Sequence, residues 1–156
     1  MKTRVRALRF WGARTDWRSR MLEVKTISIS IERDWREVYE AVWRPEFFPK
    51  WASGLANSSF GKSAGRWTAE GPGGPVSIRF TDHNDFGVMD HYVELDNGDE
   101  IYVPLRVFAN EAGAEISLTL FRQPGMSTAT FDADADWVRK DLTALKKLVT
   151  TGTSKK

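Results

Sequence analysis

The sequence predicts one α+β domain in which a curved antiparallel sheet wraps around a long C-terminal helix, in the order β-α-α-β6-α. Three observations lead there: a strictly alternating segment at 24–31, a series of strand-like segments after Gly54, and an amphipathic stretch at 128–150. Serial strands with short turns form antiparallel meanders, and one long helix can cover a face of such a sheet. We expect an internal cavity between the helix and the bent sheet.

The first elements follow from local patterns. Residues 24–31 alternate between apolar and polar side chains, so they form a half-buried strand. Asp34 then caps a helix, with Glu37 three residues on. This helix ends near Trp43, because Pro45 disfavours helical geometry in the residue before it. Pro45 itself opens a second short helical turn.

Six further strands follow, separated by turn residues. The strongest turn signals are the Gly-Pro-Gly-Gly run at 71–74 and the Asp-Asn-Gly-Asp run at 96–99. This punctuation predicts strands over residues 56–62, 66–70, 75–82, 87–95, 100–108 and 114–122.

The chain closes with a helix from about residue 128 to residue 150. Ser127 is the expected N-cap. Apolar residues then recur every three or four positions, which is the spacing of one helix face. That face comprises Phe131, Ala135, Val138, Leu142, Leu145 and Val149.

Parity along the strands predicts which side chains face the helix. A two-residue turn at 84–85 would pair Phe80 with Met89. Met89 and His91 then point inward and Asp90 points to the opposite face.

The next two hairpins extend the same reasoning. A three-residue turn with Gly98 as a bulge sets His91 opposite Val103. A four-residue turn at 110–113 then brings Arg122 to the inner face, one register step from His91. His91 and Arg122 are the two polar groups that we expect on an otherwise apolar inner face.

Positive charge is concentrated at the N-terminus. Residues 1–20 hold seven basic groups and one acid, a net charge of +6, and the whole chain is at +2, so residues 21–156 are at −4. Nucleic-acid binding needs a basic face, so we expect none through the folded domain.

We expect residues 1–21 to be a basic extension, either a disordered tail or a misassigned start of translation. An Arg-rich targeting segment or a basic binding arm are the alternatives. The domain then spans residues 22–150, and residues 151–156 form a polar tail.

Composition excludes several kinds of site. The chain has no cysteine, which excludes a disulfide scaffold, thiol catalysis and cysteine-ligated metals. It has no run of 18 apolar residues that would predict a transmembrane segment. A phosphate-binding loop that ends at Gly61 needs a glycine five residues earlier, where this chain has Ala56. A calcium loop that starts at Asp132 needs a glycine at the position of Trp137. We therefore expect no metal and no cofactor.

Six segments carry a resemblance to a known superfamily. They are Ile27–Tyr39, Phe48–Leu55, Phe86–Val93, Val103–Val107, Leu120–Ser127 and Trp137–Lys146. Together they resemble the START-like superfamily, also called helix-grip, SRPBCC or Bet v 1-like, and within it the polyketide cyclase/dehydrase and lipid-transport group. The resemblance covers residues 22–150 and implies a helix-grip fold with an internal cavity, in a cytoplasmic bacterial protein. The superfamily includes cyclases, lipid and quinone carriers, receptors and stress proteins, so the activity stays open.

Three functional hypotheses follow, each with its own use of the cavity. The leading one is binding of a small hydrophobic molecule that is lipid-, quinone- or polyketide-like. The second is an aromatase/cyclase or dehydratase, a lyase or isomerase, in which His91 is the general acid/base and Arg122 stabilises an enolate or holds a carboxylate. The third is an interaction module whose cavity is filled by side chains; a homodimer is also open.

The predicted ligand contacts come from the inner face of the sheet and from the last helix. They are His91, Arg122, Trp67, Ile78, Phe80, Met89, Val103, Leu105, Leu118, Leu120, Val138 and Leu142. For His91 and Arg122 the structural alternatives are a buried imidazole bonded to the backbone and a guanidinium that reaches water.

Overall fold

The computed structural model describes residues 21–56, 59–71 and 73–151. The predicted N-terminal extension and polar tail therefore lie almost wholly outside the described residues. Within the described ranges no helix is long and apolar enough to cross a membrane.

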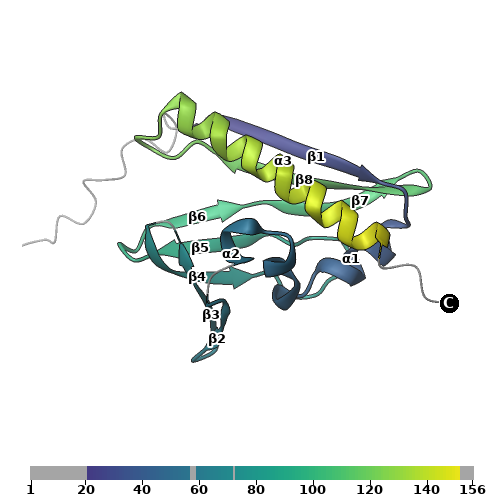
Figure 1. Ribbon diagram of the computed structural model, residues 1–156, viewed down its shortest axis with the longest axis horizontal. Helices are drawn as coiled ribbons and strands as arrows, with labels where there is room; N and C mark the ends of the chain where they lie inside the picture. The colour runs from purple at the N-terminus through teal and green to yellow at the C-terminus, as the bar shows by residue number, and fades with distance from the viewer. Residues whose placement is uncertain (1–20, 57–58, 72, 152–156) are drawn as a thin grey trace, which may run out of the picture.

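Two antiparallel sheets and one long helix make up the molecule (Figure 1). The three-stranded sheet has the order β1-β8-β7, and the five-stranded sheet has the order β2-β3-β4-β5-β6. The strands are β1 (Val24–Ile31), β2 (Gly61–Ser63), β3 (Arg66–Gly71), β4 (Gly74–Phe80), β5 (His91–Leu95), β6 (Glu100–Val103), β7 (Leu105–Asn110) and β8 (Gly113–Phe121). Of the predicted strand 56–62, the described residues place Ala56 in a short helix and Gly61 onward in the short β2, and residues 57–58 lie outside the description.

The helices follow the predicted order, with one further short helix, α2, after the predicted turn at Pro45. They are α1 (Trp35–Val42), the 3-10 helix η1 (Pro45–Lys50), α2 (Ser53–Ala56) and α3 (Thr128–Thr151). The carboxylate of Asp34 accepts hydrogen bonds from the backbone N–H groups of Arg36 and Glu37, so it caps α1 as predicted. The hydroxyl of Ser127 accepts one from the N–H of Thr130, at 3.1 Å, and caps α3. Figure 1 shows α3 crossing the three-stranded sheet, where it contacts β1 and β8.

Pro104 divides the predicted strand 100–108 in two, so the single curved sheet that we expected is two sheets. A proline has no N–H for a strand ladder. Up to Val103 the chain pairs with β5, and from Leu105 onward it pairs with β8. The N–H of Leu105 donates to the Asp90 carboxylate at 3.1 Å.

The turn predicted at 84–85 is wrong, but the side chains of the following strand still point to the predicted faces of the sheet. Phe80 pairs with His91 rather than with Met89. The wide connection between them is held by the side-chain amide of Asn84, which bonds backbone groups of Asp82, Phe86 and Val88. Since the register shifts by two residues, every side chain keeps its face.

The two later hairpins have the predicted register. Gly98 has a φ of +85°, as a bulge turn requires, and His91 pairs with Val103. Leu105 pairs with Leu118 across β7 and β8.

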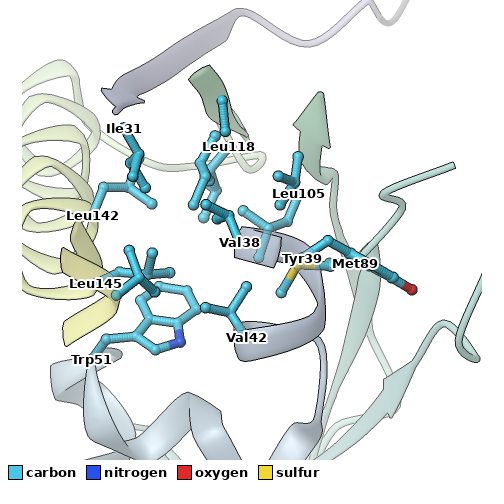
Figure 2. Packing of buried hydrophobic residues seen from close by; sticks show 14 of the residues in the cluster. Ile31, Val38, Tyr39, Val42, Trp51, Met89, Leu105, Leu118, Leu142 and Leu145 are labelled. Carbon is cyan, nitrogen blue, oxygen red and sulfur yellow. The ribbon is translucent and has the colours of Figure 1, made fainter. Parts of the chain in front are cut away.

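The hydrophobic core lies between the three-stranded sheet, α1 and α3 (Figure 2). Ile31, Val38, Leu105, Leu142 and Leu145 are all at most 1% exposed. Removing each such side chain from water stabilises the fold by about 1.5–3 kcal/mol. This core is where the fold gains most of its apolar burial.

Candidate functional site

A cavity of about 670 Å³ lies between the five-stranded sheet and the helices α2 and α3. Side chains of β4 and β5 form one wall, and Phe48 of η1, Leu55 of α2 and Trp51 between these two helices add aromatic and apolar side chains. Leu118 of β8 and Trp137 of α3 complete the lining. Its volume lies in the range of small-molecule sites, and most of its surface is apolar.

The cavity runs along β4 and β5. Phe80 and His91, which pair across these strands, line one end, and the Val76–Leu95 pair lies four residues away toward the hairpin turns. At about 3.3 Å per residue the two pairs are about 13 Å apart. This length suits an elongated or polycyclic molecule.

His91 is the one imidazole in the described lining, and it is neutral. Its Nδ1 lies 3.3 Å from the carbonyl oxygen of Met89. A carbonyl only accepts, so Nδ1 carries the hydrogen and Nε2 is left as an acceptor. The rings of Phe48 and Phe80 lie 5.5 and 5.6 Å away. Burial among these groups lowers the pKa of His91 from 6.5 to about 4, against smaller opposing effects from Met89 and Asp90.

Asp90 was expected outside and is instead buried on the face opposite His91, at 7% exposure. Its carboxylate accepts hydrogen bonds from Arg106, at 2.6 and 2.7 Å, from the Tyr102 hydroxyl at 2.5 Å, and from the Leu105 N–H. Burial alone would raise the pKa of Asp90, but these bonds outweigh it and lower the pKa. Asp90 therefore joins the two sheets at Pro104 and gives His91 no hydrogen bond.

Arg122 does not share a site with His91, which corrects the predicted pair. Its Nη1 forms an ion pair with Glu23 at 2.9 Å, and its Nε donates to the carbonyl oxygen of Met126 at 3.0 Å. The predicted placement assumed a continuous strand 100–108, whereas Pro104 separates β6, which lies in the five-stranded sheet with His91, from β7, which pairs with β8. Arg122 is absent from the described cavity lining.

The other predicted contacts fall into three groups. Ile78, Phe80, His91 and Leu118 line the cavity. Met89, Leu105 and Leu142 are buried in the core, and Val103, Leu120 and Val138 pack against it. Trp67 stacks on Phe60 with ring centroids 5.0 Å apart and borders a second hollow, which shares Ile78 and Phe80 with the cavity. The prediction treated the whole space under the helix as cavity, whereas the part toward the three-stranded sheet is packed.

Strand parity places Val76, Val93 and Leu95 on the inner face with Ile78 and His91, and all three line the cavity, although they were not among the predicted ligand contacts. The acidic residues were missed because polar side chains on a helix or at a hairpin turn look like solvent-facing ones. They are Glu70, Asp96, Asp134 and Asp141.

A polar bridge joins α2 and α3 at the cavity border. The Asp141 carboxylate accepts from the hydroxyl of Ser53 at 2.6 Å and from its N–H at 3.3 Å. The indole Nε1 of Trp137 donates to the same hydroxyl. Burial raises the pKa of Asp141, and the bonds from Ser53 offset this only in part.

Comparison with known proteins bears on the fold. No protein-family model matches the chain, and neither does any curated protein. Among solved structures, the chain is similar to XoxI from Bacillus cereus, with 13% identity, a TM-score of 0.63, and coverage of 83% of this chain and 96% of the other. It is similar to Ara h 8.0201, with 10% identity, a TM-score of 0.61, and coverage of 84% and 99%.

A third similar structure is DynU16, a protein from the dynemicin biosynthetic locus. It shows 15% identity and a TM-score of 0.62 over 83% of this chain, which spans about half (48%) of DynU16. Each of the three superpositions takes in more than four fifths of this chain. The chain therefore has the helix-grip fold of the Bet v 1-like, or SRPBCC, proteins.

Proposed function

We propose that this protein binds a small hydrophobic molecule, lipid-, quinone- or polyketide-like, in the cavity between α3 and the five-stranded sheet. The observation that carries the proposal is the apolar cavity of about 670 Å³, bordered by Phe48, Trp51, Phe80 and Trp137. An aromatic lining of this kind gives a flat or chain-like molecule a large contact area.

The two alternatives are less well supported. An interaction module with a filled cavity does not agree with that volume. A general acid/base works best with a pKa near the working pH, whereas the pKa of His91 is about 4, so at neutral pH it is no imidazolium acid and only a weak base. The neighbouring carboxylate of Asp90 bonds Arg106 instead.

The test is a titration of the full chain with N-phenylnaphthylamine, a neutral probe that fluoresces in apolar surroundings. Val93 lines the cavity, so Val93→Trp fills it and is expected to weaken probe binding about tenfold or more. Val24→Trp is the matched control, because Val24 is 51% exposed on β1, and it leaves binding unchanged. Circular dichroism verifies that both variants fold. The proposal fails if the wild type does not bind the probe, or if Val93→Trp binds it as well as the wild type does.

A further inference from the structure

Every charged side chain in the described lining of the cavity is acidic. Glu70 and Asp96 belong to the hairpin ends of the five-stranded sheet, and Asp134 and Asp141 belong to α3. No lysine or arginine occurs among the lining residues that the structure describes. Two opposite borders of the cavity thus carry the same sign of charge.

No group at the other end of the cavity reverses this sign. His91 is neutral at neutral pH, because burial lowers its pKa to about 4. Arg122, the cation that the sequence placed beside it, is paired with Glu23 instead. Arg106 donates to Asp90 on the opposite face of the strands. An anionic ligand would therefore enter without a partner, and burying an unpaired charge is strongly unfavourable.

A hydroxyl or an amine on the ligand would find hydrogen-bond acceptors in the cavity lining. Asp141 is a carboxylate held in a partly desolvated position, where burial raises its pKa. A hydrogen-bond donor or a cation beside it stabilises the charged form. The Nε2 of His91 is a further acceptor.

We propose that the cavity takes an apolar molecule whose polar end is a hydroxyl or an amine, and that it rejects carboxylate, sulfonate and phosphate ligands. This inference rests on the proposed function of the cavity and specifies the class of molecule within it.

A matched pair of probes tests the charge preference directly. N-phenylnaphthylamine and anilinonaphthalenesulfonate share their ring system and N–H group and differ in the sulfonate. The full chain is expected to bind the neutral probe at least about tenfold more tightly at low salt, since unscreened like charges repel across a low-dielectric site. Displacement of the neutral probe by decylamine and decanol, but much more weakly by decanoate, extends the test to chains of one length.

Two charge-reversal variants locate the effect. Asp134→Lys changes a lining residue, whereas Asp136→Lys makes the same change two residues along α3, where Asp136 borders a separate hollow with Lys140. The ratio of the two probe affinities is expected to fall about three- to tenfold in Asp134→Lys and to stay near the wild-type value in Asp136→Lys.

The outcomes separate this inference from the function on which it rests. If neither probe binds, the proposed function fails. If the neutral probe binds but the sulfonate binds equally well or better, only the charge preference fails. Equal ratios in the two variants would likewise overturn the role of the acidic border.

Discussion

The two sheets face α3 in different ways. Toward the three-stranded sheet the helix presents Leu142, Leu145 and Val149, all at most 3% exposed. Toward the five-stranded sheet it presents Asp134, Trp137 and Asp141, which border the cavity. Both sets recur every three or four residues, so they are adjacent stripes of one helix. One stripe is close-packed and the other borders empty space, which indicates that stability and binding depend on different flanks of α3.

Trp51 is the point at which the two regions meet. It belongs to the buried cluster, with 5% exposure, and also lines the cavity. Figure 2 shows its indole beside Leu145 and Val42. The core therefore forms one wall of the cavity, and substitutions in one region can be compared with matched substitutions in the other.

The largest difference is expected from truncating a leucine in each region. Leu145→Ala removes a side chain that is 0% exposed, and it is expected to lower the free energy of unfolding by about 3 kcal/mol. Leu95→Ala removes a half-buried leucine that borders the cavity, and it is expected to cost about 1 kcal/mol or less. Urea denaturation measures both. Similar losses in the two variants would contradict the division between a packed and a hollow region.

The next largest difference is expected in how the free energy of unfolding depends on pH. His91, in the cavity, has a pKa of about 4 in the folded state and about 6.5 when unfolded. Below pH 6.5 the unfolded state binds the proton, so stability falls as the pH falls from 6.5 toward 4 and is constant below that. From this group the loss is roughly 2 kcal/mol by pH 5. His91→Gln is expected to remove this loss, as measured by urea denaturation at pH 7 and pH 5.

The carboxylates with shifted pKa values are the same in wild type and in His91→Gln, so their contributions cancel when the two proteins are compared. Asp90 has a lowered pKa, so its stabilisation is present above the ordinary value of 3.8 and is lost only at lower pH, as the pH passes through the folded pKa. Asp141 has a raised pKa, and its titration favours the folded state as the pH falls, opposite in sign to His91. If wild type and His91→Gln lose the same stability between pH 7 and pH 5, the assignment of a neutral His91 in the folded protein is wrong.

The smallest effect is expected at Arg122, which lies outside both regions. Arg122→Ala removes a partly exposed ion pair with Glu23 and is expected to cost less than about 1 kcal/mol. Because Arg122 is not in the cavity lining, the affinity for N-phenylnaphthylamine stays unchanged. A loss of probe affinity in this variant, measured by fluorescence titration, would restore the site first expected for Arg122.

Strand parity and helix capping predicted most of the fold, whereas Pro104 made part of the predicted site wrong. The inward position of His91 survived a wrong turn at 84–85, because strand faces repeat every two residues. The predicted position of Arg122 was wrong because it was extrapolated across Pro104, where the partner strand of the chain changes from β5 to β8. The acidic border could not be predicted, since a second stripe on α3 becomes visible only once α2 and the hairpin ends are placed beside it.

The bridge from Trp137 and Asp141 to Ser53 has a kinetic consequence. It fastens the start of α2 to α3 without placing Ser53 in the cavity lining. Ser53→Ala removes the hydroxyl that bonds both Trp137 and Asp141. Association and dissociation rates of the neutral probe N-phenylnaphthylamine are then both expected to rise. The bridge would thus set how long a ligand resides in the protein.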